Sequence, residues 1–383
     1  MMETQHLVPL KPLDLGKIEN FSDMLKAMSE TAFAGRQLGE AADILVEMSL
    51  DQAYTKVLTL SGAMTVAKMG LIICDMIDKG LVDIVISTGA IMCHGLVEST
   101  GGVHFKCPGN VDDEELRKNF FDRVYDTLES EKNLDYVEKL VSHILNGLDT
   151  DVRLCSWQFF HVLGEYLDRN TDTSTRGILK SAYQKGVPVF TPAFTDSELG
   201  LDLALHNMKQ VSQMRKITKI QDDYSKMAAI LNEMEEVRMQ GKSSLRIFDF
   251  NPMDDLYHYA RMILGAKKLG IITVGGGVPA NWARQVGPFL DIARLRLLDE
   301  DDKRAYMIDH SDHPCNKRFS RGIRICPDSE HLGGLSGCTF REAVSWGKVV
   351  PESKGGKYAE IRCDATAVLP FLIKGVLERL EKS

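Results

Sequence analysis

Hydrophobic positions near the start of the chain repeat with the spacing of an amphipathic helix. The residues with this spacing are Phe21, Met24, Met28, Ala32, Leu38, Ala41, Leu45 and Met48. We therefore predict a helix over residues 21–48, in which Gly35 and Gly39 permit a break. Residues 1–20 contain two prolines and no sustained periodicity, so they are expected to form an N-terminal arm.

Further along, short apolar runs alternate with helical stretches. Runs at 54–60 and 81–88 predict strands, and the segment 64–79 between them predicts a helix. A strand, a helix and a second strand within about 35 residues form a βαβ unit, which implies a parallel sheet. The alternation returns later, with strands predicted at 187–194, 269–274 and 358–363 and helices over 281–296 and 364–382.

The remaining segments decide the domain organisation. Residues 111–175 are charged and have a helical pattern, so they are expected to be extra helical decoration on an α/β fold. Since no linker rich in proline, glycine and serine divides the chain, residues 21–383 are expected to form a single domain.

Composition excludes several classes of protein. The chain has 383 residues, of which 44% are hydrophobic, and a net charge of −8, so it is globular and has no general attraction for nucleic acid or anionic membranes. No apolar run reaches the roughly 18–20 residues of a membrane span, and no secretory signal is visible. The eight cysteines are scattered without a CxxC pair, which indicates reduced thiols and a cytoplasmic location.

A glycine-rich turn follows the strand predicted at 269–274. Gly275, Gly276 and Gly277, with Ala280, match the pattern G-x-G-x-x-A before a helix, which is typical of a dinucleotide site at a helix N-terminus. The alternative is a tight strand-to-helix turn without a ligand. Small or polar residues at other strand ends, which would meet at the same sheet edge, are Ser61, Thr88, Asp196 and Asp364.

A second candidate lies in the segment from Ser336 to Lys348. Thr339 and Glu342 have the spacing of a helix capping box. Lys348 follows that helix, close in sequence to Trp346, where desolvation would lower its pKa and make it an amine nucleophile that forms Schiff bases. The alternative is an ordinary surface lysine.

Two other groups of residues carry weaker indications. The segment 309–315 is rich in Asp, His and Cys but lacks a helical His pair or a CxxC partner, so we expect no metal site. Cys93 and His94 follow a predicted strand, and on an extended segment adjacent side chains point in opposite directions. A direct Cys–His pair is therefore not expected, although His94 could face a ligand crevice.

With these residues in place, the chain resembles the deoxyhypusine synthase family. The run Glu342-Ala-Val-Ser-Trp-Gly-Lys348 is similar to the family's signature, and the similarity extends over about residues 20–380. The segments 333–340 and 87–94 resemble the bacterial, deoxyhypusine-synthase-like branch. The resemblance implies a Rossmann-like parallel sheet with helices on both faces, NAD as the cofactor, and a homotetramer with active sites shared between paired subunits.

The resemblance also implies a reaction. In this family NAD oxidises spermidine at its secondary amine, a 4-aminobutyl group passes to a lysine as an imine, and an acceptor amine then receives it. Lys348 matches that lysine, Trp346 would pack along the polyamine, Glu342 would bind an ammonium group, and Ser336 lies in the substrate loop. The positions that match NAD contacts are Gly275, Gly276, Gly277, Thr88, Asp196 and Asp364.

Several departures from the family pattern affect the substrate. A pair of glutamates is replaced by Cys93 and His94, and a histidine of the redox step is Asn281, so His94 and Asn281 are expected at the substrate. A polyamine-binding aspartate is Leu201, with Asp202 one position late. The acceptor could be the lysine of a hypusine-bearing initiation factor or putrescine, which would give homospermidine. The alternatives are a non-catalytic regulatory homologue that binds NAD and polyamine, and an ordinary nicotinamide dehydrogenase.

Overall fold

The computed structural model describes residues 8–149, 153–217, 223–240, 247–297 and 317–382. The chain divides into two compact units, each formed by several segments. The first contains Met1–Gly62, Asp75–Ile86 and Leu256–Ser383, and the second contains Ala63–Cys74 and Ser87–Asp255. The expected N-terminal arm and the expected single domain over 21–383 stay predictions.

A parallel sheet forms the core of the first unit, which confirms the predicted α/β class. Its strands follow the order β2 (Ile84–Ser87), β1 (Tyr54–Leu60), β7 (Lys268–Val274), β8 (Arg321–Ile325) and β9 (Lys357–Ile361). The pairs β1–β7, β7–β8 and β8–β9 are all parallel. The apolar pattern did not indicate β8, because arginines occupy two of its five positions. Arg324 is nevertheless buried, where it pairs with Glu360 at 3.4 Å.

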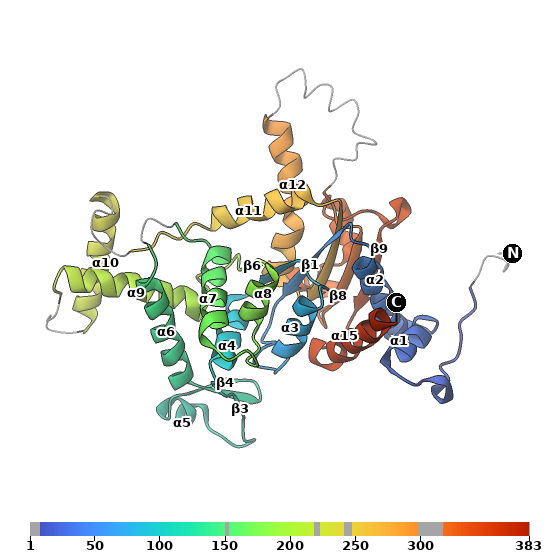
Figure 1. Cartoon of the computed structure of the whole chain (residues 1–383), viewed down its shortest axis with the longest axis horizontal. Helices are drawn as coiled ribbons and strands as arrows, with labels where there is room; N and C mark the ends of the chain where they lie inside the picture. Colours follow the sequence, from blue (N-terminus) through green and yellow to red (C-terminus); the bar gives the residue numbers. More distant parts are fainter. Residues whose placement is uncertain (1–7, 150–152, 218–222, 241–246, 298–316, 383) are drawn as a thin grey trace. The chain divides into compact units, whose positions relative to one another are not determined.

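Three helices pack together beside this sheet, namely α1 (Phe21–Ser29), α2 (Phe33–Leu50) and α15 (Ala365–Glu381) (Figure 1). The helix predicted over 21–48 is therefore two helices, and the break lies at residues 30–32 instead of at the glycines. Gly39 has a different role, because a Cβ there would lie 2.3 Å from the backbone nitrogen of Ser29. Its missing side chain lets α1 and α2 approach closely.

The other helices of the first unit carry the loops near the sheet edge. Helix α12 (Gly277–Leu297) follows β7 and packs on β1, and α14 (Phe340–Ser345) precedes β9. Short 3-10 helices are η2 (Leu15–Lys17), η3 (Glu330–Leu332), η4 (Leu335–Gly337) and η5 (Glu352–Lys354). Helices α3 (Gly70–Asp78) and α11 (Pro252–Gly265) each contain the point where the chain passes from one unit to the other.

The second unit is mainly helical. Its helices are α4 (Gly89–Ser99), α5 (Asp113–Lys118), α6 (Glu131–Asn146), α7 (Ser156–Asn170), α8 (Ile178–Lys185), α9 (Glu198–Met214) and α10 (Asp223–Gln240). An antiparallel sheet of β3 (Phe105–Lys106), β5 (Thr127–Ser130) and β4 (Phe121–Val124) interrupts the segment predicted as helical over 111–175. These strands are too short for their alternation to be recognised in the sequence.

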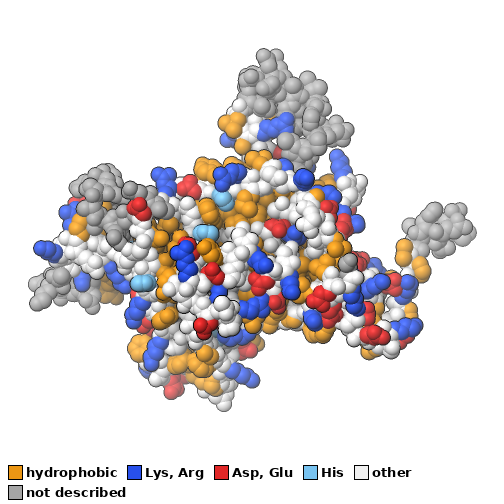
Figure 2. Space-filling model, in the orientation of Figure 1, with side chains coloured by type: hydrophobic (Ala, Val, Ile, Leu, Met, Phe, Trp, Pro, Cys, Tyr) orange, Lys and Arg blue, Asp and Glu red, His pale blue; other side chains and the backbone are white. Residues whose placement is uncertain are grey.

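Two further expectations for the second unit need correction. The strand predicted at 187–194 is only β6 (Val189–Phe190), since prolines flank it. Cys93 and His94 lie in helix α4 and not on an extended segment. Within the described ranges, no helix is long and apolar enough to cross a membrane. Basic and acidic side chains are interspersed over the face shown in Figure 2.

Candidate active site around Lys348

The carboxyl ends of four strands lie at one edge of the parallel sheet. The last paired residues across these strands are Leu60, Val274, Ile325 and Ile361. Backbone hydrogen bonds continue one residue further, from Ser61 to Val274 (3.0 Å) and from Gly275 to Ile325 (2.8 Å). Beyond β9, the Asp364 carboxylate accepts the Thr366 backbone N–H at 2.8 Å and caps α15. Ligands of open parallel sheets bind at this edge.

The glycine turn after β7 has the geometry of a phosphate-binding turn. Gly275 and Gly277 have φ of +79° and +61°, a region that favours glycine. A Cβ on Gly275 would lie 2.2 Å from Ser61 Oγ, and one on Gly276 would lie 2.5 Å from Ser336 Cα. A Cβ on Gly277 would meet nothing within 4 Å, so the start of α12 is open on that side.

Helix α12 begins four residues earlier than the sequence predicted, directly at Gly277. Pro279 occupies its first turn, where a missing N–H costs nothing. The Gly276 N–H already donates to Ser61 Oγ at 2.7 Å, and the N–H groups in the first turn of a helix have no intrahelical acceptor, so they are suited to an anion such as a pyrophosphate. The residues present thus fit a dinucleotide.

Lys348 is buried in the first unit, with 6% of its surface exposed. Its Nζ donates a hydrogen bond to Asn281 Oδ1 at 2.8 Å and lies 5.3 Å from the centroid of the Trp346 ring. The backbone N–H of Lys348 bonds to Ala343 O at 3.1 Å, just after Gly347, whose φ is +65°. The loop is therefore fixed with the amine pointing inward, and Lys348 is not the ordinary surface lysine of the alternative interpretation.

Burial lowers the pKa of Lys348, and the charge of Arg284 lowers it further. Cys338 and Glu342 oppose this change but do not cancel it. Arg284 is itself 3% exposed, and its Nε donates to Ala280 O at 3.0 Å. It lies one helical turn beyond Asn281 on α12. Sequence analysis missed Arg284, because nothing in its local pattern distinguishes it from a surface arginine. A lowered pKa increases the fraction of neutral, nucleophilic amine.

Of the other site residues predicted near Lys348, Glu342 and Trp346 are exposed, whereas Ser336 is hydrogen-bonded within its loop. Glu342 is exposed, and its N–H donates to Thr339 Oγ1 at 3.2 Å, as expected for the start of α14. Trp346 is 62% exposed. Ser336 lies in η4, where its hydroxyl bonds to Asp328 and its carbonyl accepts from Arg324 at 2.6 Å. The roles proposed for these side chains stay predictions.

Three predicted site residues belong to the second unit. Thr88 is the N-cap residue of α4, and its buried Oγ1 has no hydrogen-bond partner within the described part of the chain. Asp196 is exposed in the segment before α9. His94 is buried in α4, with Nδ1 3.1 Å from Glu129 Oε2. Their roles stay predictions, and the segment 309–315 lies outside the described residues.

Helix α9 contains Leu201, which occupies the position expected for a polyamine-binding aspartate, and Asp202, which follows it. Leu201 is 64% exposed, whereas Asp202 is partly buried. Burial raises the pKa of Asp202 to about 7, and the nearby carboxylates of Glu138 and Glu198 add to the shift. This carboxyl therefore loses its proton near neutral pH, which sequence analysis had no means to detect.

Comparison with known proteins gives a consistent result. The sequence profile of the deoxyhypusine synthase family matches residues 23–240 and 234–376. The chain is 31% identical to a "Probable deoxyhypusine synthase 2" of Archaeoglobus fulgidus, covering 91% of this chain and 96% of that protein. It is 29% identical to a protein of the same name from Methanosarcina acetivorans, covering 97% and 90%. It is 28% identical to the "Deoxyhypusine synthase-like protein" of Chlorobaculum tepidum, covering 95% and 88%.

The fold has a counterpart among solved structures. A crystal structure of a candidate deoxyhypusine synthase from Entamoeba histolytica superposes with a TM-score of 0.53. The alignment covers 96% of this chain and 97% of the other, at 13% sequence identity. At that identity the likeness supports the fold alone.

Proposed function

The chain belongs to the deoxyhypusine synthase family, and on that premise we propose that it transfers a 4-aminobutyl group from a spermidine-like polyamine to an amine acceptor. The transfer passes through a covalent imine on Lys348. The observation that carries this proposal is the environment of Lys348. The side chain is buried, its amine donates a hydrogen bond to Asn281, and its pKa is lowered. A structural lysine has no need of an environment that disfavours its charge.

NAD is the proposed cofactor, and the first unit offers the residues to hold it. The turn Gly275–Gly277 and the first turn of α12 would take the pyrophosphate, for the reasons of backbone conformation and open N–H groups given above. The carboxylate of Asp364, in the same unit, is proposed as a further contact. When bound, NAD would supply a hydride acceptor for oxidation of the donor amine and, in its reduced form, the hydride that reduces the imine on the acceptor to the final amine.

Lys348 performs the group transfer in this proposal. Its neutral amine attacks the C=N carbon of the oxidised donor, forms a new C=N bond to Nζ, and releases 1,3-diaminopropane as the leaving amine. The acceptor amine then attacks the same carbon and releases Lys348 as a free amine. Burial and Arg284 favour the neutral amine, and Asn281 Oδ1 holds Nζ in one position, which reduces the entropy lost on reaction.

The acceptor remains one of two amines in this proposal, a protein lysine of a hypusine-bearing initiation factor or free putrescine, which would give homospermidine. Asn281 and Leu201 replace residues that would contact ammonium groups in the family, so recognition of the polyamine is expected to differ.

A homotetramer with shared sites is also proposed, supported by Trp346, whose ring is largely uncovered by its own chain. The scattered cysteines support a cytoplasmic location.

The test uses the purified chain with NAD and labelled spermidine, with and without each acceptor. We expect release of 1,3-diaminopropane, and borohydride should trap a labelled adduct on Lys348. Lys348→Arg keeps the positive charge but should abolish the adduct while NAD binding persists. Absence of both products with a range of polyamines would favour the non-catalytic regulatory homologue. Unchanged turnover in Lys348→Ala would favour an ordinary dehydrogenase.

A further inference from the structure

A compact group of metal-ligating side chains lies in the second unit. His94 lies on α4, His104 lies just before β3, and Glu129 lies on β5. All three are buried, with exposed fractions of 8%, 7% and 1%. Among the described residues, they are the one group of three or more histidine, cysteine or acidic side chains whose ligand atoms converge.

The three ligand atoms lie close enough together for one metal ion to contact all of them. Glu129 Oε2 lies 3.1 Å from His94 Nδ1 and 2.6 Å from His104 Nε2, and the two nitrogens are 3.4 Å apart. The point in their plane that is equidistant from all three lies about 1.8 Å from each. An ion about 1 Å out of that plane is therefore about 2.1 Å from every ligand atom, which is a normal distance for zinc.

The surroundings orient these ligands toward one another. Glu129 Oε1 accepts hydrogen bonds from Asn133 Nδ2 at 2.6 Å and from the Ser130 backbone N–H at 3.0 Å. Oε2 is thereby directed at the two imidazoles. Two neutral histidines and one carboxylate are a known donor set for zinc and for other divalent transition metals. Imidazole donors disfavour magnesium and calcium, which prefer oxygen ligands.

We propose that His94, His104 and Glu129 form a zinc-binding site that fastens the antiparallel sheet β3-β5-β4 to helix α4. Water would complete the coordination. Each neutral imidazole binds through a nitrogen lone pair and carries its proton on the other ring nitrogen. This departs from the sequence-based expectation of no metal, because the three ligands are widely spaced along the chain. A metal on His94 Nδ1 also leaves only Nε2 for any contact with substrate.

Metal binding at His104 Nε2 has a consequence for two neighbours. Lys68 Nζ lies 2.8 Å from His104 Nδ1, and Glu98 Oε1 lies 4.0 Å from the same nitrogen. Once Nδ1 carries the proton, Lys68 can no longer donate to it, and Glu98 becomes the acceptor. A carboxylate that accepts from a metal-bound histidine is a common supporting contact. Lys68 keeps its existing ion pair with Glu98, at 2.7 Å.

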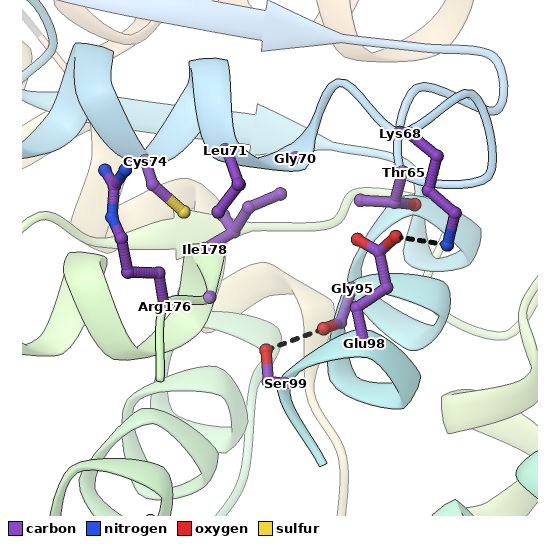
Figure 3. Close-up of a pocket in the computed structure, with 11 residues that line it drawn as sticks. Thr65, Lys68, Gly70, Leu71, Cys74, Gly95, Glu98, Ser99, Arg176 and Ile178 are labelled. Atoms are coloured by element: carbon purple, nitrogen blue, oxygen red, sulfur yellow. Dashed lines mark hydrogen bonds and ion pairs between the residues drawn. The ribbon is translucent and has the colours of Figure 1, made fainter. Parts of the chain in front are cut away.

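A pocket gives access to this supporting pair. Lys68 and Glu98 line a cavity of about 290 Å³, together with Thr65, Leu71 and Arg176. Figure 3 shows their ion pair at the pocket wall, opposite Arg176 and Ile178. The cavity therefore borders Lys68 and Glu98, the two side chains whose contacts with His104 change when a metal binds, whereas the His104 side chain itself is buried.

The experiment measures zinc and cobalt binding to the full chain after removal of bound metal with a chelator. Wild type should bind about one equivalent of Zn²⁺, and Co²⁺ should give visible absorption bands of a four-coordinate site. His104→Gln and Glu129→Gln should bind at least 100-fold more weakly. His143→Gln, which changes an exposed histidine of the same unit, should bind like wild type. Zinc should raise the thermal unfolding midpoint of wild type and leave that of His104→Gln unchanged.

A further variant keeps the proposal testable if a ligand variant does not fold. Glu98→Gln leaves all three ligands in place, and we expect 10- to 100-fold weaker zinc binding with the same cobalt spectrum. Equal zinc affinity in wild type, His104→Gln and Glu129→Gln would overturn the proposal. So would the absence of cobalt bands in wild type at stoichiometric metal. In either case the three side chains are only a hydrogen-bonded cluster, in which both imidazoles donate to Glu129.

Discussion

Replacing Gly276 by alanine tests whether the turn after β7 and the loop that carries Ser336 are packed as the structure has them. The new Cβ would lie 2.5 Å from Ser336 Cα and 2.9 Å from Ser336 Cβ and O. These are backbone atoms or atoms next to the backbone, so no side-chain rotation relieves the contact. The loop must move by about 1 Å to restore a normal separation, and overpacking of this kind costs about 1–3 kcal/mol.

That movement would also disturb a buried charge. Ser336 O accepts from Arg324 Nη2 at 2.6 Å, and Arg324 is 2% exposed. A hydrogen bond to a charged group contributes about 1.5–3 kcal/mol, and part of this is lost when the loop shifts. We expect a total loss of about 3 kcal/mol in the free energy of unfolding, which corresponds to several degrees in the unfolding midpoint.

The assay is thermal unfolding followed by circular dichroism, with NAD binding measured on the same samples. Gly334→Ala is the matched control in the same loop, since its Cβ would meet only Ser336 Oγ, at 3.8 Å, and its φ is −79°. Gly276→Ala should unfold several degrees below Gly334→Ala and bind NAD more weakly. Equal midpoints for the two variants would refute the packing described here.

Three other variants test the electrostatics and the helix packing. Arg284→Met removes a positive charge and should raise the pKa of Lys348, so borohydride trapping should need a higher pH; an unchanged pH profile would contradict this. For Asp202 the folded-state pKa lies above the unfolded value, so its ionised form destabilises the fold. The stability gained by Asp202→Asn should therefore increase from about pH 4 to pH 7 and stay constant above pH 7. The increase is at most about 1.4 kcal/mol per pH unit, and it is expected to be smaller because solvent screens the charge of a partly exposed group. A pH-independent difference in unfolding midpoint would exclude this account. Gly39→Ala should destabilise by about 1–3 kcal/mol because its Cβ meets the backbone of α1, whereas Gly35→Ala, with a nearest atom at 3.4 Å, should be neutral or slightly stabilising in denaturant unfolding.

Local pattern determined much of the fold in advance. The strand predicted at 54–60 is β1, and the strand predicted at 269–274 is β7, which begins one residue earlier. Asp364 is the N-cap residue of α15, as expected. These features depend on side-chain periodicity and on turn chemistry between close neighbours, both of which are written in the sequence. The glycine turn is of the same kind, since its backbone conformation needs residues without a Cβ.

Where local pattern failed, the deciding contact was distant in sequence. The break between α1 and α2 does not occur at a glycine, because Gly39 is used for the approach of two helices. Strand β8 was missed because its burial depends on a pairing between Arg324 and Glu360 that the sequence does not reveal. Helix α4 was missed because it begins at Gly89, directly after the strand predicted at 81–88.

The sequence alone therefore determined the parallel α/β core, the glycine turn and the choice of Lys348 as the candidate nucleophile. Only the tertiary structure decided that this amine is buried, that Asn281 is its partner and that Arg284 disfavours its charge. It also decided that His94, His104 and Glu129 converge. The physical reason is that desolvation and charge–charge interaction depend on distances in space, and folding sets those distances between residues far apart along the chain.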